Sequence, residues 1–170
     1  MNITIAMQFD EQEAIALLNW LARVNARQLR ARPELPLLYD SCVVYRPEQD
    51  ERWCDYLNLL AQGHEDCDGL AAARAGELMA RGYQALRPQE PGYLEAHTKQ
   101  LKTIPAEVYL TTHLPNGKTG LYHCVVKYRV GKNWYTDDPS KRLGMHGGVD
   151  PNIVRTCHLQ RLNKTPWRTV

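Results

Sequence analysis

The sequence has no long apolar run, no large excess of one charge and no closely spaced cysteine pairs. No stretch approaches the ~18 apolar residues that span a membrane, and the chain does not open with a basic segment followed by an apolar one. Its net charge of +2 is too small to indicate a surface for nucleic acid or membrane. We therefore expect a cytoplasmic protein without nucleic-acid or membrane partners.

The five cysteines, at positions 42, 54, 67, 124 and 157, are an odd number and lack the paired spacing of zinc ribbons. Free thiols in a reducing compartment are the simplest explanation. At least one of these thiols could then be reactive.

The chain has 170 residues, of which 44% are hydrophobic and 24% are charged, and it contains no internal repeat. These values are typical of a soluble globular domain. We expect an N-terminal strand and helical arm over residues 1–36 and the main domain over 37–170, the two forming one compact unit.

The first half of the chain is predicted to be helical. Asp10 and Glu13 have the spacing of a capping box, and Pro33 stops the helix that they open. Two further helices are expected over 50–62, with Asp50 as N-cap, and over the alanine-rich segment 70–81. Each is followed by a glycine that ends it: Gly63 and Gly82.

The second half is predicted to be β-rich, with strands over 104–112, 121–130 and 133–136. Asn116-Gly117 and Gly131-Lys132 are turn signals between these strands. Helices followed by an antiparallel sheet predict an α+β fold.

Cys67 is the cysteine best placed for chemistry, because it lies at the junction of a loop and the first turn of the third predicted helix. The free N–H groups and the positive dipole end of a helix lower the pKa of a thiol. Its acidic neighbours Glu65, Asp66 and Asp68 oppose that effect, so a separate cationic partner is needed. Most buried cysteines are small apolar packing residues, and we interpret three of the five in that way: Cys42, Cys54 and Cys157.

His123 and Asp138 are the candidate partners. His123 opens a predicted strand, where an imidazole can take a proton from a thiol on a facing helix. Asp138 follows the next strand, and a hairpin at 131–132 would bring its carboxylate back to orient the imidazole. Asp137 is the alternative orienting residue, although strand alternation aims its side chain at the opposite face. Each residue alone has a plainer interpretation: a surface histidine and an Asp-Pro turn.

Together these segments resemble the transglutaminase-like superfamily of papain-like thiol enzymes. Within it they are most similar to bacterial and phage cysteine peptidases whose nucleophile lies in a Gly-Asp-Cys-Glu-Asp type motif. The first block here is Glu65-Asp66-Cys67-Asp68-Gly69, and the second is His123, Trp134 and Asp138-Pro139-Ser140. Tyr45-Arg46-Pro47 and Trp53 also resemble phage members of the group. The resemblance covers about residues 37 to 145.

The resemblance implies a papain-like core in which the nucleophile helix packs on an antiparallel sheet, within a thiol-enzyme domain at 37–170. It implies a Cys67, His123 and Asp138 triad that cleaves a peptide or isopeptide bond of a peptide or protein substrate through a thioester, without a cofactor or metal. Three further residues are candidates to line the site or stabilise the oxyanion: Tyr45, Trp53 and Asp66. The resemblance also makes a phage-encoded protein, in the cytoplasm or in the virion, one expectation.

Two departures from the family pattern adjoin the nucleophile. Glu65 stands where glycine is usual, and Gly69 replaces the second acidic residue. The substitution at Gly69 removes a carboxylate near the triad, which bears on rate and substrate preference.

Three alternatives stay open at this stage. A transamidase would use the same thioester, although the small size of the chain favours hydrolysis. A non-catalytic binding or assembly module, as in a phage particle, would keep the fold without the activity. A zinc site is the third, with His64 and Cys67 as ligands and Cys54, Cys124 or His123 completing it. We also expect the polar segment 88–102, which contains His97, to form a mobile flap over the cleft.

Overall fold

The computed structural model of the chain describes residues 10–48, 52–111, 123–147 and 149–151. The helices in these residues are α1 (Glu11–Ala31), α2 (Tyr56–Gln62), α3 (Cys67–Arg81), α4 (Tyr93–Thr98) and α5 (Pro139–Arg142), with 3-10 turns η1 (Leu38–Asp40) and η2 (Gly82–Ala85). The strands are β1 (Val44–Tyr45), β2 (His64–Glu65), β3 (Ala106–Thr111), β4 (His123–Val130) and β5 (Asn133–Asp137). β1 and β2 form a parallel pair, and the other three form an antiparallel sheet in the order β3-β4-β5. The predicted α+β class is confirmed.

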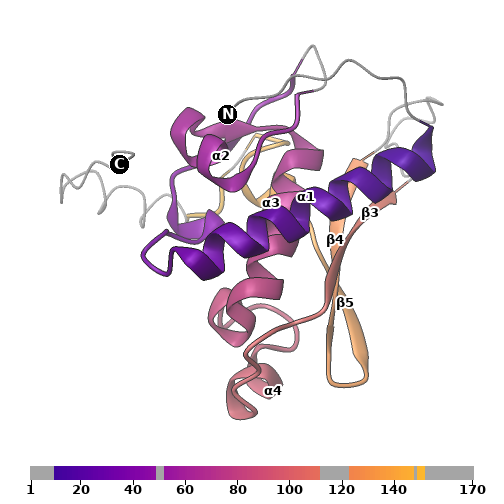
Figure 1. The fold of residues 1–170 in the computed structure, drawn as a ribbon. Coiled ribbons are helices and arrows are strands. Elements are labelled where there is room, and N and C mark those ends of the chain that lie inside the picture. Colours follow the sequence, from indigo (N-terminus) through magenta and orange to yellow (C-terminus); the bar gives the residue numbers. More distant parts are fainter. Residues whose placement is uncertain (1–9, 49–51, 112–122, 148, 152–170) are drawn as a thin grey trace.

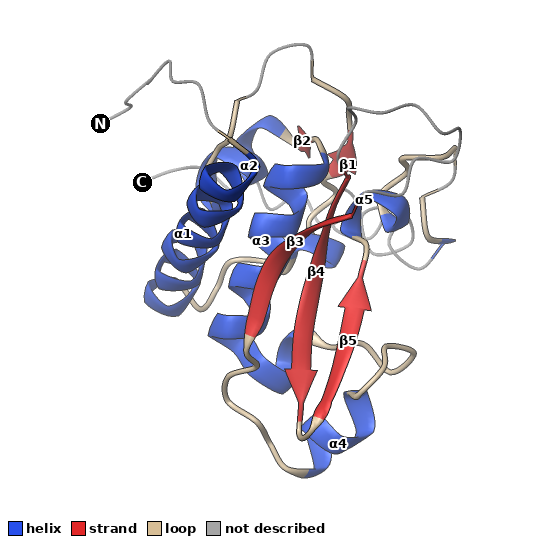
Figure 2. Cartoon of the chain, turned by 90° about the vertical axis from the view of Figure 1, so that its right-hand side faces the viewer, coloured by secondary structure: helices blue, strands red, loops and turns tan. Residues whose placement is uncertain are grey.

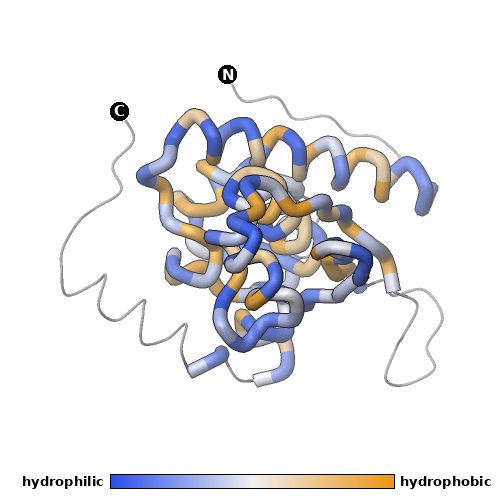
Figure 3. The backbone as a smooth tube through the Cα atoms, turned by 90° about the horizontal axis from the view of Figure 1, so that it is seen from below, coloured by the Kyte–Doolittle hydropathy of each residue, from blue (hydrophilic) through white to orange (hydrophobic). Residues whose placement is uncertain are grey.

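α1 begins and ends as its local sequence predicts. The Asp10 side chain accepts the N–H of Glu13 at 2.9 Å, the Glu13 side chain accepts the N–H of Asp10 at 3.0 Å, and the helix ends before Pro33. Its backbone trace alternates between hydrophobic and hydrophilic residues, as expected for a helix with one buried face (Figure 3).

α1 packs closely across α3 at Gly76. A side chain at Gly76 would place its Cβ 2.7 Å from Cβ of Asn25 and 2.9 Å from the carbonyl oxygen of Ala22. Leu18 and Ala22 of α1 lie in the same hydrophobic core as Val126 of β4. The first helix is therefore built into the core, while the division of the chain at residue 36 stays a prediction.

The predicted start of α2 is wrong. Residues 52–55 are not helical, and the helix begins at Tyr56 with Asp55 as its N-cap. Asp50 itself lies outside the described residues. Asp55 accepts the N–H of Asn58 at 3.0 Å and also a hydrogen bond from Gln28 of α1 at 2.8 Å, which fixes the start of the helix there. The predicted end is confirmed, since Gly63 terminates α2 with a φ of +76°.

α3 is the central helix of the molecule. It lies between α1 on one side and the sheet on the other (Figures 1 and 2), and residues 68–78 are all buried. Its many alanines allow both neighbours to approach closely. The helix ends at Gly82 as predicted, and its first residue is Cys67.

The three strands lie where they were predicted, except that β3 begins at Ala106 and not at residue 104, and β5 extends to Asp137. In the register, Thr111 pairs with His123 and Val126 pairs with Asp137. The predicted turn at Gly131-Lys132 joins β4 to β5, whereas the one at Asn116-Gly117 lies outside the described residues.

The segment 88–102 is not a flap over the candidate site, so that prediction is wrong. It forms α4 at the end of the sheet where β4 meets β5 (Figure 2), and the Tyr128 hydroxyl donates to the carbonyl of Pro91 at 2.8 Å. Ala96 of α4 is fully buried, and the ring of His97 packs on that of Tyr93 with centroids 3.9 Å apart. His123 lies at the opposite end of β4, a strand of 8 residues, which is roughly 23 Å away.

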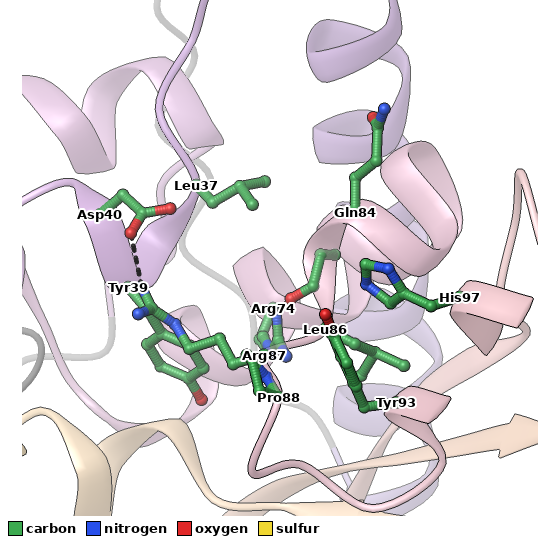
Figure 4. Close-up of a pocket in the computed structure, with 11 residues that line it drawn as sticks. Leu37, Tyr39, Asp40, Arg74, Gln84, Leu86, Arg87, Pro88, Tyr93 and His97 are labelled. Carbon is green, nitrogen blue, oxygen red and sulfur yellow. Dashed lines mark hydrogen bonds and ion pairs between the residues drawn. The ribbon is translucent and has the colours of Figure 1, made fainter. Parts of the chain in front are cut away.

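A buried charge network around Arg74 ties α3 to the rest of the fold. The guanidinium, which has no solvent exposure, lies 2.8 Å from Asp137, 2.9 Å from Glu90 and 3.0 Å from Glu77. An adjoining cavity of about 170 Å³ is lined by residues that include Tyr39, Arg74 and the ion-paired Arg87 and Asp40 (Figure 4). None of the predicted site residues lines this cavity.

In the part of the chain that the structure describes, no helix has the length and apolar character needed to cross a membrane.

Candidate active site

Cys67 is presented at the N-terminal end of α3, with its side chain half-buried. The N–H groups of Cys67 and Asp68 belong to the first turn, so they have no acceptor within the helix. The same end of the helix carries a partial positive charge. The parallel pairing of β1 with β2, in which Tyr45 is opposite Glu65, fixes the segment that leads into it. This position favours a thiolate over a thiol.

His123 and Asp138 are hydrogen-bonded to each other, with 2.9 Å between Nε2 and Oδ2. His123 is the first residue of β4 and Asp138 directly follows β5, so the hairpin brings them together. Asp138 is held in turn as the N-cap of α5, where its Oδ1 accepts the N–H of Lys141 at 3.0 Å. The structure thus pairs the two residues that the sequence selected.

Asp137 is not the partner of the imidazole, so the alternative assignment is wrong. Its Oδ2 lies 2.8 Å from Nε of Arg74 and 2.9 Å from the hydroxyl of Tyr39. Successive side chains of a strand point to opposite faces, which sends Asp137 into the buried network and leaves Asp138 for the imidazole.

Cys67 interacts with His123 and with a residue that the sequence did not select, Cys124. The pKa of Cys67 is lowered to about 4, chiefly by the hydrogen bond from the Cys124 thiol; the His123 ring and the backbone N–H of Cys124 add to this against the effect of burial. The pKa of His123 is raised to about 9, first by its hydrogen bond with Asp138 and then by Cys67. At neutral pH the pair is therefore a thiolate and an imidazolium.

The two ring nitrogens of His123 serve different partners. Nε2 bonds to Asp138, whereas Nδ1 is buried and makes no hydrogen bond, so it is the nitrogen available to Cys67. Burial alone would raise the pKa of Asp138, but its hydrogen bonds with His123 and the N–H of Lys141 lower it. Asp138 therefore stays ionised while it orients the ring.

Cys124 reaches Cys67 because of where the sheet ends. Strand alternation puts Cys124 on the face of β4 opposite His123, where it lies in the core with Val126. However, β5 pairs with β4 only from Val126 onward, and the backbone N–H of Cys124 donates to the Cys67 sulfur instead. One signal in the sequence could have predicted this contact. Cys124 directly follows the candidate base His123, and its side chain lies on the face of the strand that packs against the nucleophile helix.

Tyr45 lies near the thiolate. Its pKa is raised by burial and, in decreasing order, by the charges of Cys67, Asp66 and Asp68. The phenol therefore stays protonated at neutral pH and can donate a hydrogen bond. This makes Tyr45 the best candidate for a side-chain donor to an oxyanion beside Cys67.

Trp53 and Asp66 have other positions. The indole N–H of Trp53 donates to Oδ2 of Asp68, so it holds the first turn of α3. Asp66 is the residue before α3, and its side chain makes no capping hydrogen bond. A carboxylate accepts hydrogen bonds and does not donate them, so only a lining role remains as a prediction for Asp66.

Glu65 is a buried carboxyl group beneath the same turn. It accepts hydrogen bonds from the thiol of Cys54 at 2.7 Å and from Nε2 of Gln62 at 3.1 Å. Burial raises its pKa to about 7. A Cβ at Gly69 would lie 2.7 Å from Cδ of Glu65 and closer still to its Cγ. Glu65 therefore occupies the space that a side chain at position 69 would need.

The zinc site considered from the sequence has no counterpart among the described residues. They contain no group of three histidine, cysteine or acidic side chains that could hold a metal ion. The proposed ligands are engaged separately: Cys54 bonds to Glu65, and Nε2 of His64 lies 3.4 Å from Arg46.

Comparisons of the chain with protein-family models, curated proteins and solved structures found no match. The functional assignment therefore depends on the geometry of the site.

Proposed function

We propose that this chain is a thiol acyl-transfer enzyme, a cysteine peptidase or amidase of the transglutaminase-like group with a papain-like core. One observation carries the proposal: a half-buried thiol at a helix N-terminus interacts with an imidazole whose other nitrogen is held 2.9 Å from a carboxylate. This is the arrangement of an activated nucleophile, its base and an orienting group.

The first chemical step is attack by the Cys67 thiolate on an amide carbonyl carbon. A carbon–sulfur bond forms, and the carbonyl electron pair moves to oxygen. The N–H groups at the start of α3 are the backbone donors for the resulting oxyanion, and the Tyr45 hydroxyl is the side-chain donor. Preorganised donors of this kind stabilise an oxyanion with little reorganisation during the step.

The second step breaks the carbon–nitrogen bond. The imidazolium of His123 gives its proton to the leaving amine, and a thioester on Cys67 remains. His123, now neutral, takes a proton from water, which attacks the thioester and releases the acid and the thiolate. Asp138 keeps the ring oriented and stabilises its charged form through both steps. With an amine in place of water, the same thioester would give transamidation.

The pairing of Glu65 with Gly69 supports an intact site. A carboxyl group close to the first turn of α3 is supplied from position 65 in place of position 69. Relative to the family pattern, the carboxyl group thus comes from position 65 and not from position 69. The space beside the turn that carries Cys67 remains occupied.

Limited alkylation with iodoacetamide near neutral pH tests the nucleophile. Peptide mapping is expected to find Cys67 modified before the other cysteines, and His123→Ala to slow that reaction. Cys42→Ser is the matched control, because it removes a free thiol outside the site and should leave the labelling of Cys67 unchanged. Equal labelling of all cysteines, or protection of Cys67 in the folded protein, would contradict the proposal and favour a non-catalytic module.

Acylation by p-nitrophenyl acetate tests the thioester step. We expect a burst of nitrophenol equal to the protein concentration and an acetyl group on Cys67, both lost in Cys67→Ala. Release of acetate alone identifies a hydrolase, whereas transfer to added glycine methyl ester identifies a transamidase. Acetylation that persists in Cys67→Ala with an unchanged burst would overturn the assignment of the nucleophile.

A further inference from the structure

Two thiols meet at the candidate site, although the acyl-transfer chemistry needs only one. Cys67, the first residue of α3, packs against the hydrophobic cluster that contains Cys124 of β4, and the two thiols interact, each being the largest cause of the other's shifted pKa. Cys67 is half-buried and open to small reagents, whereas Cys124 is only 3% exposed within the core. Both are free thiols. A reactive thiol in contact with a sheltered second thiol is the arrangement of a peroxide-sensitive cysteine and its resolving cysteine.

We propose that a peroxide oxidises Cys67 and that Cys124 then closes a disulfide with it, which switches the enzyme off reversibly and protects the nucleophile. The inference rests on the proposed thiol chemistry at Cys67 and adds a regulation of that site.

The oxidation balances in two steps. The Cys67 thiolate attacks one oxygen of hydrogen peroxide, so the S–O bond forms, the O–O bond breaks, and the departing hydroxide takes up a proton to become water. The sulfur loses two electrons, which the peroxide gains. The sulfur of Cys124 then attacks that of Cys67, the S–O bond breaks, and the hydroxide leaves as water with the proton of Cys124. Two equivalents of an external thiol reverse the disulfide.

The charges at the site favour attack by Cys124 only after Cys67 has been oxidised. The pKa of Cys124 is raised by its hydrogen bond with Cys67, by burial and by the charge of Cys67. Conversion of the Cys67 thiolate to a neutral sulfenic acid removes the first and third of these causes. Cys124 is therefore inert while Cys67 is a nucleophile and becomes easier to ionise once Cys67 has been oxidised.

The other described cysteines are placed less well. The thiol of Cys54 is bonded to Glu65, and Cys54 packs against a different core cluster from the one that holds Cys67 and Cys124. Cys42 lies in the turn that follows η1. The pairing is consequently expected to be specific to Cys124.

The experiment treats the reduced full-length chain with hydrogen peroxide, blocks remaining thiols, and maps disulfides by mass spectrometry without reduction. The expected product is a Cys67–Cys124 cross-linked peptide that has lost two hydrogen atoms and that disappears on treatment with dithiothreitol, with iodoacetamide labelling of Cys67 restored. In Cys124→Ala, Cys67 should proceed to sulfinic acid, and dithiothreitol should no longer restore labelling. Cys42→Ser is the matched control and should behave as the wild type.

The outcomes separate this inference from the proposed function. If Cys67 reacts fast with iodoacetamide in the reduced protein and yet forms its disulfide with a cysteine other than Cys124, the disulfide switch is wrong and the enzyme proposal stands. The same holds if labelling of Cys67 recovers as fully in Cys124→Ala as in the wild type. If the disulfide forms but the reduced protein forms no acyl-enzyme, the switch stands and the enzyme proposal fails. The mapping in the wild type decides the matter even if Cys124→Ala does not fold.

Discussion

Glu65 fills the space that a side chain at position 69 would need. A Cβ at Gly69 would lie 2.7 Å from the Glu65 carboxyl carbon, and Glu65 has no solvent exposure through which to move away. Gly69 is in the first turn of α3, two residues after the candidate nucleophile. The identity of residue 65 therefore constrains residue 69, and the two positions form one structural unit.

Because of this relationship, we expect Gly69→Ala to destabilise the protein, although the same substitution normally stabilises a helix. Gly→Ala in a helix interior is favourable by up to about 1 kcal/mol. We expect Gly69→Ala instead to lower the free energy of unfolding by roughly 1–3 kcal/mol, because the added methyl group overlaps Glu65. In the Glu65→Ala background the loss should shrink by about 1 kcal/mol or more. Urea denaturation of the four proteins of the cycle measures this coupling.

Gly76→Ala is the matched control for that cycle. It too lies in α3, but its Cβ would meet Asn25 and not Glu65. It should destabilise the protein and add to Glu65→Ala without coupling. Equal coupling of both glycines to Glu65, or none for Gly69, would show that the two positions do not share one space.

Two adjacent aspartates give a second prediction. Asp138→Asn should lower the rate of acylation of Cys67, because the imidazole loses the carboxylate that orients and charges it and then stabilises the Cys67 thiolate less. Asp137→Asn should instead lower the free energy of unfolding, on the order of 3 kcal/mol, because Arg74 loses a buried counter-charge 2.8 Å away. Denaturation and p-nitrophenyl acetate bursts, measured on both variants, separate the two effects. A reversed pattern would assign the orienting role to Asp137.

Much of the fold follows from local signals in the sequence. The capping box at Asp10 and Glu13, the stop at Gly82 and the turn at Gly131 are each decided by a few neighbouring residues. The candidate triad could be selected for the same reason: a helix start, a strand start and an Asp-Pro step mark Cys67, His123 and Asp138, and one hairpin register joins two of them.

The features that the sequence did not reveal depend on contacts distant along the chain. Asp50 and Asp55 are equally good capping residues, and the contact of Asp55 with Gln28 of α1 favours the second. Segment 88–102 looked mobile because it is polar, yet Ala96 within it is fully buried against the core. Arg74 and Glu77 inside an alanine-rich helix were a visible sign of a buried ion pair, but the Asp137 and Glu90 partners could not be inferred.

The Tyr45 hydroxyl is expected to contribute to the oxyanion site. Tyr45→Phe should lower the rate of acylation by about 10²–10³-fold, the range found when a single oxyanion donor is removed. The pH dependence of iodoacetamide labelling should change little, since the thiolate itself is retained. Tyr109→Phe, which removes a hydroxyl from an exposed tyrosine on β3, is the control and should have no effect. If Tyr45→Phe acylates at the wild-type rate, the donor is another group.

The charged pair gives the two reactions of Cys67 different pH profiles. Alkylation by iodoacetamide needs only the thiolate, so it should fall as the pH drops through about 4, the pKa of Cys67. Acyl transfer to an amide also needs the imidazolium to protonate the leaving amine. It should fall in addition as the pH rises through about 9, the pKa of His123.

Variants of Asp138 and Cys124 should shift these two pH profiles in opposite directions, one at its alkaline limb and the other at its acid limb. In Asp138→Asn the largest cause of the raised pKa of His123 is gone, so the alkaline limb should move down toward 6.5, the ordinary value for histidine. In Cys124→Ala the largest cause of the lowered pKa of Cys67 is gone, but His123 and the backbone N–H of residue 124 still lower it, so the acid limb of alkylation should move up from about 4 only in part. Rates measured from pH 3 to 10 on the three proteins give both limbs. An alkylation rate that rises only near pH 9 in the wild type would mean that Cys67 is an ordinary thiol, and the ion pair would then be absent.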